Sequence, residues 1–527
     1  MIIRTQQIKL LVILLLFITA CNSNNVSKTE NYLPNTITVK GDKFVDNLGR
    51  QVILNGINIV SKSKKEGYIF PSGPELYENL THWGANCIRF YISWDRLESE
   101  PGIYSEEYLK EIDQRIAWAK ENNLFVVLDM HQDLFSAKFD NGAPEWAALD
   151  EGKPHTTGLI WSDAYLLSEA VQTSFDNFWL NKPASDGKGV QDHYALLWQH
   201  IARRYANSST VIGYDLMNEP FPGTSAKQST MILLKSYGEL KYKLTGEILT
   251  EEQLVYMWGD EKSRMQVLND LSTKENFDFV FSKLFELNKE FEVNYLQSMY
   301  QKVANAIREV DTKHILFLEH SYFSNSGVKS SLERVLLADG SPDPFVAYAP
   351  HGYDLVTDTD AVALASNERV SHIFSRISEK GKQLKMPVWL GEWGAFYGNS
   401  ESVIPVAIDA ISLIEQNLFG NAYWSYDPGT ENLEYFKKVL IRPYPSYVNG
   451  ELISYQNNFE TATFTMEWRE NEQIASPTVL YIPNISKLKK DQVNDFSIKE
   501  LKNSDAGYLI IPPKNDGSKR NLILMFR

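Results

Sequence analysis

The heptapeptide Tyr214-Asp215-Leu216-Met217-Asn218-Glu219-Pro220 is the most informative part of this 527-residue chain. Residues 211–216 form a short apolar run typical of a buried strand. The strand ends before Pro220, because proline has no N–H with which to continue a hydrogen-bonded ladder. Glu219 therefore stands where a buried strand meets a loop. A carboxylate there is costly unless it finds a partner or takes part in chemistry.

A second glutamate has the same local setting. Residues 386–390 are another apolar run, and it ends in Gly391-Glu392-Trp393-Gly394. Cleavage of a glycosidic bond needs a proton for the leaving oxygen and a group that takes up the anomeric carbon, and two carboxylates supply both. We assign Glu219 as general acid/base and Glu392 as nucleophile, with the amide of Asn218 donating to a sugar 2-OH. Either glutamate taken alone could instead be an ordinary ion-paired residue.

Strand-like runs alternate with helical patterns between residues 52 and 425. We expect eight strands, at residues 52–59, 86–92, 124–130, 211–216, 314–318, 345–349, 387–390 and 421–425. Eight strands that alternate with helices predict an α/β fold of the (β/α)8 TIM barrel type. In that fold the loops after the strands carry the site. Glu219 would follow the fourth strand and Glu392 would end the seventh.

Two connections are too long for simple loops, namely residues 132–190 and 221–293. We expect both to wall a deep, partly apolar cleft on the catalytic face. Residues 445–527 hold short strand-like runs separated by turns, which predict a small antiparallel β-sandwich. The predicted organisation is a barrel over residues 36–440 followed by the sandwich domain at 445–527.

The N-terminus has the pattern of an export signal. Residues 1–20 begin with positive charges and continue into an apolar core that is too short to span a bilayer. Ile18-Thr19-Ala20-Cys21 resembles a bacterial lipobox, so we expect Cys21 to carry a lipid and residues 21–35 to be a flexible tether. This predicts a cell-envelope lipoprotein that faces the periplasm or the cell surface. A signal peptide cut elsewhere, with secretion, is the alternative.

The amino-acid composition limits the kinds of partner and cofactor that the protein can bind. The net charge of −15 argues against nucleic acid. The chain has 12 Trp, 27 Tyr and 26 Phe, whose rings suit the apolar faces of sugars, although a large aromatic core explains them equally well. With Cys21 acylated, Cys87 has no partner for a disulfide. Three convergent metal ligands are not evident, so we expect neither a metal nor another cofactor.

Further polar and aromatic residues fall at the ends of the predicted strands. Arg89 lies in the second strand, and its permanent charge can keep a carboxylate nucleophile ionised. Side chains at the ends of the third, sixth and eighth strands are also candidates for the site, because the C-terminal face of a barrel collects functional residues. They are His131, His351, Tyr353 and Trp424.

These motifs resemble glycoside hydrolase family 5, a family of retaining β-glycosidases. The resemblance covers about residues 36–440 and rests on Asn-Glu-Pro after the fourth strand and Gly-Glu-Trp-Gly after the seventh. It implies an active site made of Arg89, His131, Asn218, Glu219, His351, Tyr353, Glu392 and Trp424.

Within that family, two segments are similar to the endoglycoceramidase branch. They are Asp129-Met130-His131-Gln132-Asp133 and Asn141-Gly142-Ala143-Pro144-Glu145-Trp146. The similarity implies hydrolysis of the bond between the glycan and the ceramide of glycosphingolipids. It also implies that Lys62, His131 and Asp133 hold the first glucose, and that an apolar channel formed by residues 221–293 takes the lipid.

Other functions stay open on the sequence. The same branch contains β-glucosidases that act on glucosylceramide or steryl glucosides. A family 5 endo-β-glucanase or mannanase would instead have a long, open cleft lined by exposed tryptophans. A glycan-binding surface lipoprotein without catalysis is the alternative from another class, and it would not need both glutamates and Arg89.

Overall fold

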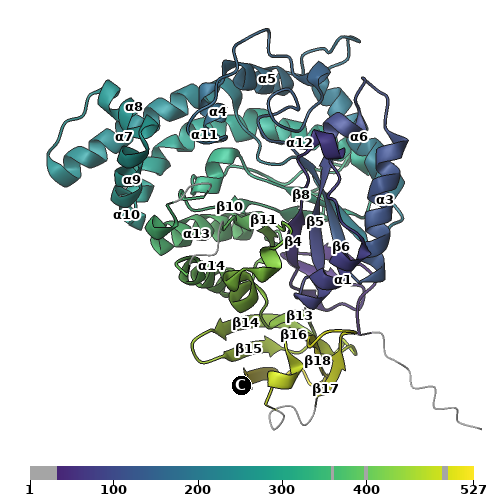
Figure 1. Ribbon diagram of the computed structural model, residues 1–527. Coiled ribbons are helices and arrows are strands. Elements are labelled where there is room, and N and C mark those ends of the chain that lie inside the picture. The colour runs from purple at the N-terminus through teal and green to yellow at the C-terminus, as the bar shows by residue number, and fades with distance from the viewer. Residues whose placement is uncertain (1–31, 358–360, 397–400, 490–495, 527) are drawn as a thin grey trace, which may run out of the picture.

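A parallel sheet rolled into a barrel forms the centre of the protein (Figure 1). The computed structural model describes residues 32–357, 361–396, 401–489 and 496–526. The strands lie in the order β10-β11-β12-β4-β5-β6-β7-β8-β9. In chain order they are β4 Asn55–Ile59, β5 Cys87–Ser93, β6 Phe125–His131, β7 Val211–Asp215, β8 Ile315–Leu318, β9 Val346–Tyr348, β10 His351–Gly352, β11 Trp389–Gly394 and β12 Gly420–Trp424.

β9 and β10 are two halves of a single barrel strand. Pro350 separates them, and a residue without an N–H interrupts the ladder. β9 pairs with β8 and β10 pairs with β11, while a bridge between Tyr348 and Val388 joins the two edges of the sheet. The sheet is therefore a closed ring with eight strand positions, and the predicted (β/α)8 fold is confirmed.

The helices that surround the ring are amphipathic. They are α1 Pro74–His82, α2 Trp94–Leu97, α3 Glu106–Glu121, α6 Val190–Tyr205, α12 Gln297–Arg308, α13 Asn367–Leu384 and α14 Val403–Asn417. α12 buries Met299, Val303 and Ile307, which recur every four residues and so share one face. α3 begins at Ser105, whose hydroxyl caps the helix by accepting the N–H of Tyr108.

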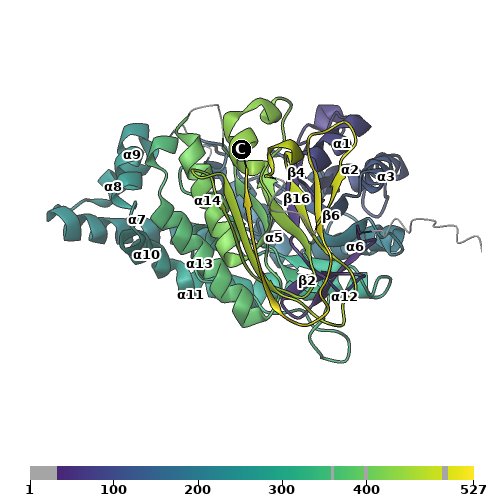
Figure 2. The ribbon, with the colours of Figure 1, turned by 90° about the horizontal axis from the view of Figure 1, so that it is seen from below.

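The two long connections carry helices of their own. The connection after β6 contains α4 Asp163–Leu167 and α5 Glu169–Trp179. The connection after β7 contains α7 Ala226–Thr245, α8 Glu251–Gly259, α9 Glu261–Asp270, α10 Lys274–Phe281 and α11 Phe285–Phe291. We call residues 226–281 the helical lobe, which projects from the barrel next to α13 in both ribbon views (Figures 1 and 2). An ion pair of 3.1 Å between Asp278 and Arg376 ties the lobe to α13.

The C-terminal part forms two antiparallel sheets, as predicted. One has the strand order β1-β2-β3-β13-β16-β18-β17 and the other β14-β15-β19. Their bounds are β1 Ile37–Lys40, β2 Lys43–Asp46, β3 Gln51–Val52, β13 Tyr444–Val448, β14 Glu451–Asn458, β15 Thr463–Arg469, β16 Thr478–Ile482, β17 Ser497–Glu500, β18 Gly507–Ile511 and β19 Lys519–Met525.

The N-terminal strands belong to the C-terminal sheet, whereas the sequence placed residues 36–440 in the barrel. Val52 of β3 pairs with Tyr447 of β13, so the predicted strand 52–59 is divided between two sheets. The chain passes from one sheet to the other within two residues. The N–H of Ile53 donates to the carbonyl of Ser446, whereas the carbonyl of Leu54 accepts from the N–H of Asn421 in the barrel. The apolar residues 52–54 give no signal of such a switch, because they are buried in either sheet.

The C-terminal sheets close the floor of the barrel. Figure 2 shows their strands lying under it. Phe44 from β2 stacks on Phe317 from β8 with ring centroids 6.1 Å apart, and Phe317 contacts Trp389 from β11. Barrel and sheets therefore share a core. In the described ranges, no helix is both long and apolar enough to cross a membrane.

Candidate active site

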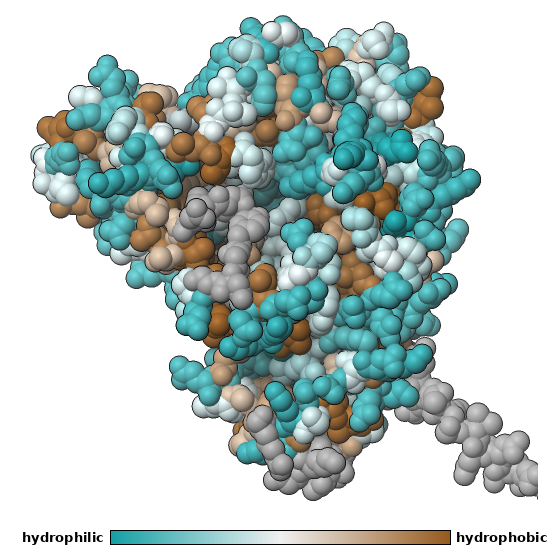
Figure 3. Space-filling view, in the orientation of Figure 1, coloured by the Kyte–Doolittle hydropathy of each residue, from teal (hydrophilic) through white to brown (hydrophobic). Residues whose placement is uncertain are grey.

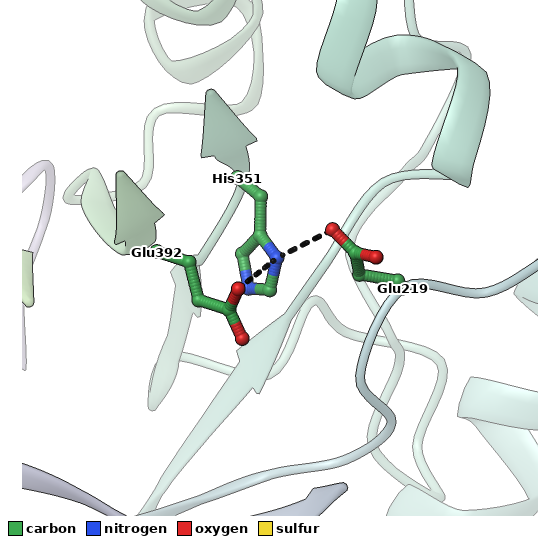
Figure 4. A group of neighbouring side chains, drawn as sticks. All are labelled: Glu219, His351 and Glu392. Carbon is green, nitrogen blue, oxygen red and sulfur yellow. Dashed lines mark hydrogen bonds and ion pairs between the residues drawn. The ribbon is translucent and has the colours of Figure 1, made fainter. Parts of the chain in front are cut away.

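The structure brings the two predicted glutamates into one pocket. Glu392 lies in β11, and Glu219 lies just beyond β7 in the turn made by Asn218 and Pro220. Glu219 has a φ of 43°, and its N–H donates to Oε2 of Glu319 at 2.8 Å. Figure 4 shows both carboxylates directed toward His351, which lies on β10 between them.

The distance between the carboxylates fits a retaining glycosidase. One carboxylate oxygen of Glu219, one of Glu392 and a ring nitrogen of His351 all lie within 4.8 Å of one another. Retaining enzymes place their carboxyl groups about 5–5.5 Å apart, whereas inverting enzymes need about 6.5–9.5 Å to admit a water. This separation leaves room for one anomeric carbon and favours a covalent intermediate.

Two donors hold Glu392 in place. Nη1 of Arg89 lies 2.6 Å from Oε1, and the hydroxyl of Tyr353 donates to Oε2 at 2.7 Å. Donors to both oxygens hold the carboxylate in one orientation, which an attacking nucleophile needs. The predicted part of Arg89 in orienting this carboxylate agrees with the geometry.

Arg89 also organises the rest of the pocket floor. It is fully buried, and its remaining N–H groups face Asp215 at 2.8 Å, Asp129 at 2.9 Å and Glu319 at 3.0 Å. It donates as well to Oδ1 of Asn218 at 3.0 Å. A buried guanidinium is tolerated only with such partners. Burial and the nearby Glu319 raise the pKa of Asp215 well above its ordinary value.

Glu219 has the environment of a general acid. Burial raises its pKa, and the carboxylates of Glu392 and Glu319 add to that effect against the opposing pull of His351. Burial by itself would lower the pKa of His351, but Glu319, Glu392 and Glu219 together raise it well above its ordinary value. His351 is thus a cation, and its Nδ1–H donates to Oε1 of Glu219 at 3.1 Å. Two carboxylates with different environments divide into acid and nucleophile.

A second group of polar and aromatic side chains lines the same cavity as the carboxylates. Nζ of Lys62 lies 2.6 Å from Asp133 and faces the rings of Trp424 and Trp161 at 4.8 Å and 5.4 Å. His131 stacks on Trp424 with centroids 5.3 Å apart. Asp129 and Asp133 raise the pKa of His131 to about 9 in spite of its burial. Charged groups and flat rings of this kind suit the hydroxyls and apolar faces of a sugar.

The cavity has a polar lining and an apolar lining. It has a volume of about 300 Å³, and all the predicted site residues except Cys21, Arg89 and His351 line it directly. Its apolar lining comes mainly from the helical lobe, which also carries brown, apolar residues on the face seen in Figure 3. The lining there includes Leu233, Leu234, Leu254, Val267, Leu268, Leu271, Val280 and Phe281. The predicted apolar wall from residues 221–293 is confirmed.

The donor set of the pocket favours proton chemistry over metal binding. Glu219, His351 and Glu392 stand close enough together to share an ion. A protonated imidazole has no lone pair to offer, however, and both oxygens of Glu392 already accept hydrogen bonds, from Arg89 and Tyr353. These side chains are better suited to moving a proton.

Sequence reasoning missed several members of the site. Glu319 directly follows β8, so it has the same strand-end position as the two predicted glutamates. The predicted strand at residues 314–318 could therefore have identified it as a site residue. Asp129 and Asp215 lie inside strands as partners of Arg89. Asn325 donates to Glu219 from the short helical turn Tyr322–Ser326, for which the sequence carries no comparable signal. Cys21 lies outside the described residues.

The barrel and the carboxylate pair at the ends of its fourth and seventh strands define a glycoside hydrolase. Residues 45–430 match the family described as Cellulase (glycosyl hydrolase family 5), so the chain belongs to glycosyl hydrolase family 5. Residues 442–517 match the Glycoside hydrolase family 5 C-terminal domain.

Within the family, the chain is similar to endoglycoceramidases. It is 30% identical over 227 residues to Endoglycoceramidase from Cyanea nozakii, covering 38% of this chain and 44% of that one. It is 31% identical over 199 residues to Endoglycoceramidase I from Rhodococcus hoagii, covering 36% and 38%. Glucosylceramidase from Rhizopus delemar is 26% identical over 242 residues, covering 35% of each chain. The alignments thus span less than half of these curated relatives.

Solved structures show the same fold over nearly the whole chain. Endo-glycoceramidase II from Rhodococcus sp. in a Ganglioside GM3 complex superposes with a TM-score of 0.70 at 22% identity, covering 93% of this chain and 100% of that one. A structure described as endogalactoceramidase gives a TM-score of 0.64 at 20% identity, covering 94% and 100%. The likeness extends through both the barrel and the C-terminal sheets.

Proposed function

We propose that the protein is a retaining endo-β-glycosidase that hydrolyses the bond between the glycan and the ceramide of glycosphingolipids. The observation that carries the proposal is the division of the cavity. One cavity is lined both by charged and aromatic side chains that suit a sugar, together with Glu219 and Glu392, and by the apolar wall of the helical lobe. A substrate cut at the junction of its polar and apolar halves fits this shape. The similarity to endoglycoceramidases supports the proposal.

In the first step, Glu392 attacks the anomeric carbon while Glu219 gives its proton to the leaving oxygen of the ceramide. Arg89 and Tyr353 hold the attacking carboxylate, and the C–O bond to ceramide breaks as the bond to Glu392 forms. Burial raises the pKa of Glu219, which favours the protonated form that this step needs. Ceramide then leaves as an alcohol along the apolar wall.

In the second step, a water attacks the glycosyl-enzyme. Glu219, now ionised, takes a proton from the water, whose oxygen bonds to the anomeric carbon as the bond to Glu392 breaks. His351, a cation next to Glu219, stabilises its ionised state between the two steps. The glycan is released with its configuration retained, and both carboxylates return to their starting protonation.

Glucosylceramide or a steryl glucoside is the second candidate substrate. The similarity to glucosylceramidases favours it, and the apolar wall would suit either lipid. A polysaccharide substrate fits less well, because the helical lobe lines the cavity with apolar side chains that a long glucan does not need. A glycan-binding protein without catalysis would have no need for the donors that hold both oxygens of Glu392.

We also propose that Cys21 is lipidated and anchors the protein in a bacterial cell envelope. The lipobox-like sequence before Cys21 and the polar segment that follows it support this. Metabolic labelling with a palmitate analogue should mark the wild-type chain and leave Cys21→Ser unmarked. Equal labelling of both would contradict the anchor and leave the proposed reaction untouched.

The test of the reaction is incubation of residues 32–527 with lactosylceramide or a ganglioside, followed by chromatography of both halves. Free ceramide and an intact glycan are expected, with no release by Glu392→Gln. Hydrolysis of glucosylceramide alone would establish the second candidate. Activity on glucan or mannan without ceramide release would overturn both.

A further inference from the structure

A line of hydrogen bonds runs from the sixth barrel strand to Glu219. His320, two residues past the end of β8, is 2% exposed and places Nδ1 at 2.6 Å from the hydroxyl of Tyr348 on β9. Its Nε2 lies 2.8 Å from Oδ1 of Asn325. Nδ2 of Asn325 then donates to Oε1 of Glu219 at 2.8 Å. His320 and Tyr348 do not line the substrate cavity, and hydrogen bonds through Asn325 connect them to Glu219.

The chemistry of each group fixes the direction of every bond in this line. An amide oxygen can only accept, so Nε2 of His320 carries the hydrogen and donates it to Asn325. Burial lowers the pKa of His320 to about 3, which leaves Nδ1 as an acceptor for the hydroxyl of Tyr348. With its oxygen held by His320, the amide of Asn325 must turn its NH2 group toward Glu219. A reversed amide would set two donors against each other at His320 and two acceptors against each other at Oε1 of Glu219.

Oε1 of Glu219 is consequently occupied by two donors. Asn325 donates at 2.8 Å, and the protonated His351 donates at 3.1 Å. Oε2 of Glu219 points away from His351 (Figure 4). A carboxyl group whose Oε1 accepts two N–H groups carries its own proton on the other oxygen.

We propose that His320 is a positioning residue that, through Asn325, confines the transferable proton of Glu219 to Oε2. The inference rests on the proposed function, and it names Oε2 of Glu219 as the atom through which the general acid transfers its proton. In the first step the Oε2–H bond breaks and the proton goes to the leaving oxygen. In the second step a proton from the attacking water forms that bond again. The alternative is that His320 is a buried histidine that contributes to folding alone.

Two variants and a control separate these readings. Asn325→Ala removes the donor to Glu219, and His320→Phe keeps the ring volume but frees the amide of Asn325 to turn. The control is His193→Phe, because His193 on α6 is also buried and bonds to Glu98 and Asp186 outside the cavity. The charged groups that face Glu219 are His351 on β10, Glu392 on β11 and Glu319 after β8, and the three variants keep all of them.

The first measurement is kcat on aryl β-lactosides with leaving groups of graded acidity. For a poor leaving group, we expect both site variants to lose on the order of tenfold, since a misplaced acid forfeits part of the general-acid contribution. For a dinitrophenolate leaving group, the loss should stay within about twofold, because no proton is needed. An equal loss with every leaving group would show a structural role and overturn the proposal.

The second measurement does not depend on activity. The carboxyl carbon of Glu219 can be titrated by NMR in protein labelled with [δ-13C]glutamate, with Glu219→Gln giving the assignment. Loss of a donor disfavours the ionised form, so Asn325→Ala and His320→Phe should move the midpoint to higher pH, and His193→Phe should not. An unmoved midpoint in His320→Phe would overturn the role of His320. If the wild type cleaved no glycoside while these shifts appeared, the proposed function would fail and the positioning would stand.

Discussion

At the scale of single residues, the chemical role of each side chain in this pocket depends on its neighbours more than on its residue type. Glu219 and Glu392 are both glutamates at strand ends, yet burial raises the pKa of Glu219 while Arg89 and Tyr353 hold the two oxygens of Glu392 in place. Their roles should therefore separate in kinetics. Glu219→Gln should lose about 10²–10⁴-fold in rate on poor leaving groups and far less on a dinitrophenyl glycoside. Glu392→Gln should lose activity on every substrate.

Steady-state rates on a series of aryl β-glycosides check this contrast. Azide offers a second readout, because it can attack the glycosyl-enzyme without a general base and should rescue Glu219→Gln only. Equal losses for the two variants on the most activated substrate would contradict the assignment of roles.

His131 should make stability depend on pH in a defined direction. Its pKa is raised to about 9 by Asp129 and Asp133, so its favourable interactions are fully present below its unfolded pKa of about 6.5. They are lost as the pH rises through about 9. The free energy of unfolding should fall across this window in the wild type, by an upper limit on the order of 3 kcal/mol from His131.

Urea unfolding at pH 6 and pH 10 measures the difference. His131→Gln should be less stable than the wild type at pH 6 and approach it at pH 10. The control is His82→Gln at the end of α1, outside the cavity, which should keep the wild-type pH dependence. A constant gap between wild type and His131→Gln at both pH values would exclude the linkage.

At the scale of elements, the helical lobe gives the cavity its apolar half. α8 shows this clearly, because Leu254 lines the cavity at 5% exposure while the next residue, Val255, is 55% exposed. Leu254→Asn should place an unsatisfied amide against the lipid chain. We expect kcat/KM for a long-chain ceramide glycoside to fall about tenfold, and hydrolysis of a water-soluble aryl lactoside to change by less than about twofold.

Val255→Asn on the same helix is the matched control and should leave both rates unchanged. Parallel assays with ceramide chains of different length would show whether the effect grows with the apolar surface of the substrate. Equal losses of Leu254→Asn on the lipid and the soluble substrate would indicate damage to the catalytic groups and refute a lipid-specific wall.

At the scale of the molecule, the two sheet systems should unfold together. The N-terminal strands pair with β13, and Glu415 of α14 accepts bonds from Arg442 and Asn457 beyond the barrel. Removal of residues 441–527 would expose the floor around Phe317 and Trp389 and leave β3 paired with β2 alone. We expect the shortened chain to aggregate, and the full chain to give one calorimetric transition. Two separate transitions, or a soluble and active barrel, would contradict a shared core.

The sequence by itself determined the ring of eight strands and the two catalytic candidates. Apolar runs of strand length and the glutamates that end them are local features, and parallel strands bring their ends to one face. It did not reveal that residues 37–52 complete the C-terminal sheet, because the run through Ile53 and Leu54 is buried in either arrangement. Nor did it show Asn325 or the carboxylate separation. Which side chains meet, which oxygen of Glu219 they occupy and how burial shifts its pKa depend on distances between segments about a hundred residues apart, and those exist only after folding.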